Sequence, residues 1–171
     1  MLFNLALILI IIFLLTLLSM VWPPDSPWAP WWRTSKKTAR AMCKLAKVKK
    51  GDVIYDLGSG DGTALMIASK EFGAKGVGVE IDPVRYFTSI LLLKFYGVLD
   101  RIKLIRGNFF EQNLQNANVV FVYLVPKTLD KLLPKFRKEL KKGTRIVSFK
   151  YEINMPLKGF NKKREIRLYI I

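Results

Sequence analysis

The sequence contains no histidine and a single cysteine, Cys43, among its 171 residues. Without histidine, the chain cannot form a Ser-His-Asp or Cys-His catalytic group, or a histidine-ligated metal site. One cysteine cannot make an internal disulfide or a thiolate zinc cluster, so we expect no metal and no oxidising compartment. Acidic residues are also scarce, since 13 Asp and Glu stand against 29 Lys and Arg and give a net charge of +16.

Charged residues are absent from Met1 to Pro24, and Leu5–Leu15 is an unbroken apolar run. As a helix rising about 1.5 Å per residue, the stretch Leu2–Trp22 would be roughly 30 Å long, the hydrocarbon thickness of a bilayer. A cleaved signal peptide would require a basic start and a small-residue cleavage site, and both are missing. A buried core helix is the other alternative. We predict a retained transmembrane anchor over residues 1–22.

The residues after the anchor predict a linker, an orientation and one further domain. Residues 23–32 are rich in proline, which predicts a stiff linker, and in tryptophan, which favours the headgroup zone of a membrane. Residues 33–50 hold eight Lys and Arg and no acid. The positive-inside rule therefore predicts a single-pass protein with its N-terminus outside and its remaining domain, 33–171, in the cytoplasm.

Apolar, β-branched runs alternate with helical patterns through the domain. The predicted strands are 53–57, 76–81, 102–105, 119–124, 145–149 and 165–170, and the predicted helices are 63–72, 83–96 and one that starts near Pro134 and stops at Gly143. This alternation is typical of an α/β fold, with a mostly parallel sheet and helices on both faces. Such sheets bind ligands beyond the carboxyl ends of their strands.

A glycine-rich loop follows the first predicted strand and reads Asp-Leu-Gly-Ser-Gly-Asp-Gly over residues 56–62. Its glycines allow the backbone to approach a ligand closely, and the following helix presents free N–H groups. A dinucleotide fingerprint would need a glycine at position 63, where this chain has Thr63. The carboxylate of Asp56 would repel a pyrophosphate and suits a ligand that carries an amine. Its alternative role is to cap the turn.

The second strand ends near Glu80, whose carboxylate can accept hydrogen bonds from both hydroxyls of a ribose. A solvated strand end is the alternative for Glu80, while Asp82 fits the N-cap of the next helix. Residues 52–82 carry a net charge of −4, and the rest of the chain carries +20. An acid for an amine, a glycine loop and an acid for a ribose together predict S-adenosylmethionine, a nucleoside with a cationic amino-acid tail.

With these motifs, the sequence resembles the class I S-adenosylmethionine-dependent methyltransferases. Residues 56–62 match their first motif, and Gly-Val-Glu-Ile-Asp-Pro over 78–83 matches their acidic second-strand motif. Residues 29–153 are similar to the small protein-lysine methyltransferases of archaea, bacteria and mitochondria, and the mitochondrial members also carry an N-terminal hydrophobic segment. This narrower resemblance rests on Ala29–Pro30 with Thr34, Gly107–Glu111, Ala117–Pro126 and Glu139–Ser148.

The resemblance implies a Rossmann-like sheet of seven strands that ends in a reversed hairpin. The patterns above account for six strands. The C-terminal edge is therefore either trimmed, or completed by a strand within residues 151–161.

The resemblance also assigns the site residues. The cofactor-binding set is Thr34, Asp56, Gly58, Ser59, Gly60, Glu80, Ile81, Asn108 and Phe109. Asn108 stands where the family often has Asp, and its amide oxygen can still accept a hydrogen bond from the adenine amine. The residues expected at the acceptor and the reacting methyl group are Phe109, Tyr123 and Pro126. Independently of the resemblance, three options would favour the neutral acceptor amine: a nearby cation, loss of the proton to water, or an apolar aromatic pocket, for which Phe109, Phe110 and Tyr123 are the hypothesis.

The sequence thus predicts a membrane-anchored enzyme that transfers a methyl group from S-adenosylmethionine to a lysine of a protein partner. The alternatives are a lipid, a quinone or another small membrane-associated acceptor, and a non-catalytic cofactor-binding module. Nucleic acid is a less favoured acceptor, although the positive charge suits it. Enzymes that methylate base amines usually carry a polar-Pro-Pro-aromatic motif after the fourth strand, where residues 122–126 read Val-Tyr-Leu-Val-Pro.

Overall fold

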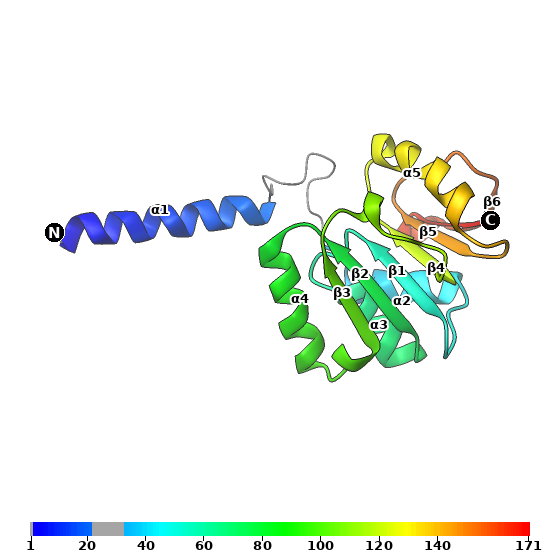
Figure 1. Cartoon of the computed structure of the whole chain (residues 1–171), viewed down its shortest axis with the longest axis horizontal. Coiled ribbons are helices and arrows are strands. Elements are labelled where there is room, and N and C mark those ends of the chain that lie inside the picture. The colour runs from blue at the N-terminus through cyan, green and yellow to red at the C-terminus, as the bar shows by residue number, and fades with distance from the viewer. Residues whose placement is uncertain (1, 22–32) are drawn as a thin grey trace.

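The computed structural model describes residues 2–21 and 33–171 as an N-terminal helix, α1, and an α/β domain (Figure 1). Helix α1 covers Leu2–Val21, and its side chains from residue 4 to residue 17 are exposed. Within the described ranges, no helix has the combined length and apolar character that crossing a membrane requires. The prediction of a transmembrane helix is therefore not confirmed. The predicted linker, 23–32, lies outside the described residues.

A seven-stranded sheet forms the centre of the domain, with the strand order β3-β2-β1-β4-β5-β7-β6. The strands β1 to β5 are parallel, and β7 is antiparallel to its neighbours β5 and β6. Their bounds are β1 Val53–Leu57, β2 Lys75–Glu80, β3 Ile102–Arg106, β4 Val119–Val122, β5 Arg145–Phe149, β6 Leu157–Asn161 and β7 Ile166–Ile170.

The C-terminal edge of the sheet is complete, so the alternative of a trimmed edge is wrong. The missing strand is β6, which pairs with β7 as the reversed hairpin. A register shift between Leu157 and Gly159 interrupts this pairing. Such an irregularity breaks the two-residue alternation by which a strand is detected in a sequence. The sequence therefore locates β6 only within a broad segment.

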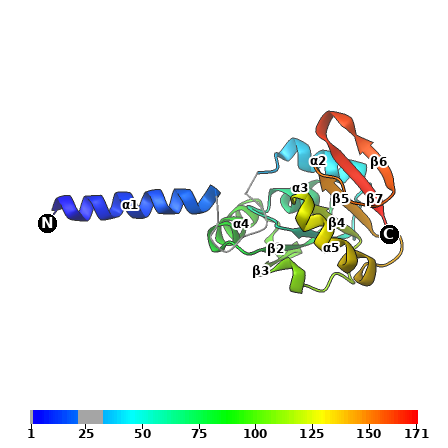
Figure 2. The same ribbon diagram turned by 90° about the horizontal axis from the view of Figure 1, so that it is seen from above.

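Helices cover both faces of the sheet (Figures 1 and 2). One face carries α2 (Lys36–Leu45), α3 (Thr63–Phe72) and α4 (Pro83–Phe95), and the opposite face carries α5 (Pro126–Glu139). Strand β4 contributes Val119 and Phe121 to one core and Val120 and Val122 to the other. This double burial explains its nearly continuous apolar sequence.

Helix α5 starts earlier than the sequence predicts. Pro134 was expected near its start, but the helix begins at Pro126, and Pro134 lies inside it. Pro126 occupies the first turn, where a missing N–H costs no intrahelical hydrogen bond. Burial of Leu129, Leu132 and Phe136 against the sheet offsets the unfavourable internal proline.

Close packing of α3 on β2 fixes how the ends of β1 and β2 lie next to each other. A Cβ atom at Gly78 would lie 2.8 Å from Cδ1 of Leu65 and 2.9 Å from Oγ of Ser59. A Cβ atom at Gly76 would lie 2.9 Å from Cδ2 of Leu65. These distances are shorter than ordinary contacts with a Cβ atom, so any larger residue at either position would force Leu65 to shift. The glycines of β2 thereby place the loop after β1 directly beside the end of β2.

Candidate active site

The glycine-rich loop turns sharply at the carboxyl end of β1. Gly58, Gly60 and Gly62 have φ angles of +83°, +56° and +76°, a left-handed region that favours glycine. The N–H groups of Gly58 and Ser59 both donate to the carbonyl oxygen of Val79, at 2.9 and 3.0 Å. The loop is therefore hydrogen-bonded to the neighbouring strand at the edge where parallel sheets bind ligands.

Glu80 at the end of β2 braces this loop from its other side. Its Oε2 accepts the N–H of Gly60 at 2.7 Å, and its Oε1 accepts the N–H of Asp82 at 3.0 Å. Each carboxylate oxygen keeps a second lone pair, so Glu80 can still bind the hydroxyls of a ribose. Asp82 caps α4 as the sequence predicts, because its carboxylate accepts the N–H of Arg85 at 2.8 Å.

Asp56 is a buried carboxyl group at the end of β1, and its side chain has no ion-pair partner among residues 2–21 and 33–171. Burial, together with the negative charges of Glu80 and Asp61, raises the pKa of Asp56 to about 7. Burial also raises the pKa of Glu80. A bound cation would favour the ionised form of Asp56. The site is therefore electrostatically suited to the amine of S-adenosylmethionine.

Asp61 ties the start of the domain to the glycine loop. Its carboxylate pairs with Nε of Arg33 at 2.7 Å and accepts the N–H of Thr63 at 3.0 Å. Arg33 directly precedes Thr34, which is half-buried. The ion pair thus holds the segment of Thr34 close to the loop, and the role of Thr34 stays a prediction.

The loop after β3 lies beside the same strand ends. The N–H of Gly107 donates to the carbonyl oxygen of Glu80 at 2.9 Å. Asn108 uses its Oδ1 to accept the N–H of Phe110 at 3.0 Å, which caps a short turn over Phe109–Glu111. Ile81, directly after β2, and Phe109 in this turn are both half-buried. The capping oxygen of Asn108 has one lone pair left for an adenine amine.

Aromatic side chains gather at the carboxyl ends of β4 and β5. The ring of Tyr123 lies 4.4 Å from that of Phe149 and 6.2 Å from that of Tyr151. Burial, together with Tyr151 and Glu165, raises the pKa of the Tyr123 phenol.

The sequence prediction grouped Tyr123 with Phe109 and Phe110, whose own rings are 4.9 Å apart. The contacts of Tyr123 lead instead to Phe149 and Tyr151, which the prediction missed. Phe149 is the last residue of β5, so extending the strand-end rule to every parallel strand would have found it. Pro126 is exposed at the start of α5.

Two hydroxyl groups of the site lack partners in the described part of the chain. Oγ of Ser59 and Oγ1 of Thr63 are buried and have no hydrogen-bond partner there. A buried hydroxyl without a partner is costly, and a polar ligand removes this cost. Together with the carboxylates of Asp56 and Glu80, these groups fit an amino-acid tail joined to a nucleoside. The individual roles of the site residues stay predictions.

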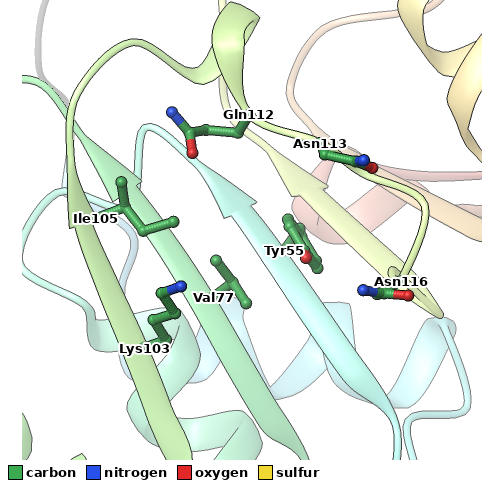
Figure 3. A pocket seen from close by; sticks show the side chains of 7 residues that line it. All are labelled: Tyr55, Val77, Lys103, Ile105, Gln112, Asn113 and Asn116. Carbon is green, nitrogen blue, oxygen red and sulfur yellow. The ribbon is translucent and has the colours of Figure 1, made fainter.

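A cavity of about 270 Å³ lies apart from these residues (Figure 3). It lies over the middle of β1, β2 and β3, beneath the loop after β3. Its lining residues are Tyr55, Val77, Lys103, Ile105, Gln112, Asn113 and Asn116. No residue predicted to bind cofactor or acceptor is among them. The cavity is therefore distinct from the strand-end site.

Comparison with known proteins identifies the family. The family described as "ANTKMT methyltransferase domain" matches residues 56–156, from Asp56 through the aromatic segment after β5. The chain belongs to this family. A protein named "Protein-lysine N-methyltransferase" from Saccharolobus islandicus (strain REY15A) is 39% identical to this methyltransferase over 150 residues, which are 87% of this chain and 89% of that protein.

A second relative, from Mus musculus, is named as an ATP synthase lysine N-methyltransferase. It is 25% identical to this methyltransferase over 122 residues, or 71% of this chain and 49% of that protein. Among solved structures, an RNA methyltransferase from Salinibacter ruber in complex with S-adenosyl-L-homocysteine superposes with a TM-score of 0.77 and 33% identity. The superposition covers 82% of this chain and 94% of the Salinibacter ruber chain.

These similarities confirm three predictions from the sequence. The protein has the class I methyltransferase fold, it is an enzyme, and its cofactor is S-adenosylmethionine. The unpartnered polar groups around Asp56 are consistent with that cofactor.

Proposed function

We propose that this enzyme methylates the side-chain amine of a lysine in a protein. The observation that carries the proposal is the 39% identity to a protein-lysine methyltransferase over nearly the whole of both chains. The aromatic group of Tyr123, Phe149 and Tyr151 supports it, because such a group can surround an alkyl amine at the edge where Asp56 lies.

The chemistry divides between cofactor and protein. S-adenosylmethionine supplies an activated methyl group when it is bound. The carboxylate of Asp56 would hold its amine, Glu80 its ribose, and Asn108 its adenine. This binding would aim the methyl group at the aromatic group, so the protein contributes positioning and exclusion of water.

The acceptor amine must lose its proton before it can react. At an ordinary pKa near 10.4, only about one lysine in two thousand is neutral at pH 7. With no histidine in the chain, aromatic surroundings would favour the neutral form by desolvation, and the proton would leave to water. Tyr123, Phe149 and Tyr151 provide such surroundings.

The aromatic assignment is tested by Tyr123→Ala and Tyr151→Ala, with Phe160→Ala on the C-terminal hairpin as the matched control. The first two variants should bind cofactor normally and lose roughly ten- to a hundredfold in methyl-transfer rate, while the control keeps both properties. Unchanged rates in both site variants would remove this group from the acceptor pocket.

We further propose that α1 attaches the enzyme to a membrane, with the domain on the cytoplasmic side. The support is the absence of charge before Asp25, the exposed apolar side chains of α1, and the eight cations of residues 33–50. Carbonate extraction of isolated membranes and protease protection test attachment and sidedness. Recovery of all the protein in the unwashed supernatant would contradict attachment.

RNA is a second candidate acceptor. The net charge of +16 and the similarity to the Salinibacter ruber enzyme favour it. The sequence Val-Tyr-Leu-Val-Pro at 122–126 speaks against transfer to a base amine, as it lacks a polar residue followed by two prolines.

One labelling experiment separates these acceptors. Whole cell extract, membranes included, receives S-adenosylmethionine with a labelled methyl group and either wild-type enzyme or Asp56→Asn. Label that hydrolyses to methyl-lysine and is absent with the variant supports the proposal. Label in nuclease-sensitive material or in extracted lipid would contradict it and name the other acceptor.

A further inference from the structure

Helix α4 exposes an apolar stripe in addition to the side that packs on the domain. Its buried face contains Arg85, Ser89 and Leu93, of which two are polar. Its outer face contains Phe87, Leu91 and Phe95, which are 57%, 69% and 82% exposed. Because each set repeats every four residues, each forms one continuous face of the helix. A surface helix ordinarily turns its apolar stripe toward the core.

The outer stripe is unusual even beside the other exposed apolar residues of the domain. Those are Leu157, Phe160 and Ile170 on the β6–β7 hairpin, at 51%, 44% and 39%. There, the guanidinium of Arg167 lies 4.8 Å from the ring of Phe160 and partly covers it. Contiguous apolar patches on a protein surface mark contact with a partner or a membrane.

Three lysines lie near the C-terminal end of the stripe on α4. Lys94 is exposed on the same helix, which contains no Asp or Glu. At its end, the amines of Lys36 and Lys70 lie 4.7 and 5.0 Å from the ring centre of Tyr96. Lys36 also donates to Oη of Tyr96 at 2.6 Å. An apolar helical stripe with lysines nearby is typical of helices that lie in the surface of an anionic bilayer.

The N-terminal segment enters the domain next to this stripe. Lys36 begins α2 and reaches the end of α4, and Arg33 pairs with Asp61 beside the glycine loop. Attachment through α1 would therefore bring α4, rather than the C-terminal hairpin, against the membrane.

We propose that α4 is a membrane-docking face. Phe87, Leu91 and Phe95 enter the boundary between headgroups and acyl chains of an anionic bilayer, and Lys36, Lys70 and Lys94 contact lipid phosphates. The inference rests on the proposed membrane attachment but is independent of the identity of the acceptor. Docking through α4 would also fix the strand-end site close to the membrane surface, since Asp82 at the start of this helix lies two residues after Glu80, the last residue of β2.

A single introduced thiol can report on this contact in the full chain. The only native thiol, Cys43, is buried, and burial raises its pKa to about 12, so it resists labelling. Leu91→Cys carries an environment-sensitive fluorophore on α4, and Leu157→Cys carries it on the hairpin as the matched control. Phe95→Cys provides a second reporter at the other end of the stripe.

Each labelled protein is mixed with vesicles of phosphatidylcholine and phosphatidylglycerol, and flotation is measured on the same samples. The reporters on α4 should shift to the blue and be quenched by spin-labelled acyl chains, and the hairpin reporter should do neither. The α4 effect should weaken with vesicles of phosphatidylcholine alone.

Three outcomes would overturn the docking face. Chain that floats while the α4 reporters stay in water would show attachment without docking. A blue shift already complete without vesicles would show that α1 or a second copy covers the stripe. Chain that does not float would refute attachment and docking together, while methyl transfer, measured separately, would stand.

Discussion

Two buried aspartates lie near the two ends of β1, and their surroundings differ. Asp52, just before the strand, accepts hydrogen bonds from the guanidinium of Arg145 at 2.8 Å and from the N–H of Lys49 at 3.0 Å. Asp56, near the other end, is buried without a pairing cation in the described residues and has its pKa raised to about 7. The first acid is satisfied by the protein, and the second is left for a ligand.

The two edges of the sheet differ in how their buried polar groups are satisfied. At the amino ends of the strands, Arg145 joins β5 to the segment before β1 and also donates to the carbonyl oxygens of Ala46 and Lys47. At the carboxyl ends, buried polar groups of Ser59 and Thr63 lack partners within the described chain. Contacts at the amino-terminal edge of the sheet stabilise the fold, whereas polar groups at the carboxyl-terminal edge are left to bind a ligand.

The largest effect is expected from Glu80→Ala, with Glu139→Ala as the control. Each glutamate accepts a backbone N–H, from Gly60 for Glu80 and from Leu114 for Glu139. Losing Glu80 removes the ribose ligand and the brace of the glycine loop, so affinity for S-adenosylmethionine should fall about a hundredfold or more. Calorimetric titration should find the Glu139→Ala protein unchanged in affinity. Equal losses would mean that both carboxylates act only through stability.

A smaller effect is expected from pH. With a pKa of about 7 in the unliganded protein, Asp56 is roughly ten-elevenths ionised at pH 8 and one-eleventh at pH 6. Affinity for the cationic cofactor should therefore fall about tenfold when the pH is lowered from 8 to 6. The free energy of unfolding should instead rise when the pH is lowered from 8 to 6. The raised pKa means that the folded chain holds this proton more tightly than the unfolded chain. This contribution to stability is present below pH 4 and is lost as pH rises toward about 7.

In Asp56→Asn protein, both pH dependences should flatten. Titrations at pH 6 and pH 8, with thermal unfolding at the same values, measure them. An affinity in wild type that does not change with pH would show that Asp56 is already ionised without ligand.

The smallest effect is expected from a pair of glycines in β2. Gly76→Ala and Gly78→Ala both force a methyl group against Leu65, and each should lower the free energy of unfolding by about 1–3 kcal/mol. Only at Gly78 would the methyl group also meet Oγ of Ser59, at 2.9 Å. Gly78→Ala should therefore weaken cofactor binding about fivefold, and Gly76→Ala should leave it unchanged. Denaturant melts and titrations measure the two properties, and equal affinities would contradict the difference between the two edges.

Much of the fold could be predicted because local patterns agree with the tertiary structure. Val53–Leu57, Thr63–Phe72 and Arg145–Phe149 have the predicted bounds, since each combines an unambiguous period with a glycine or turn at its end. Helix α5 and strand β6 could not be placed in this way. Tertiary burial overrides the internal Pro134, and the irregular pairing at Gly159 hides the alternation of β6.

Sequence patterns supply a physical argument for the cofactor side of the candidate site and much less of one for the acceptor side. Asp56 and Glu80 belong to contiguous motifs whose chemistry can be argued from residue type and spacing. The partners of Tyr123 come from β5 and the segment after it, and their proximity depends on strand order. The ion pair of Arg33 with Asp61 likewise joins residues that no local pattern connects.

The contrast between the two edges is tested most directly by thermal unfolding of wild type, Asp52→Asn and Asp56→Asn at pH 8, each with and without S-adenosylmethionine. Without cofactor, Asp56→Asn should be at least as stable as wild type, and Asp52→Asn should be less stable by about 2 kcal/mol, because its hydrogen bond with Arg145 loses its charge. With cofactor at one fixed concentration, wild type and Asp52→Asn should both be stabilised, and Asp56→Asn should gain much less. A less stable Asp56→Asn protein that still gains the full stabilisation from cofactor would show that Asp56 is a structural residue, and would contradict the account.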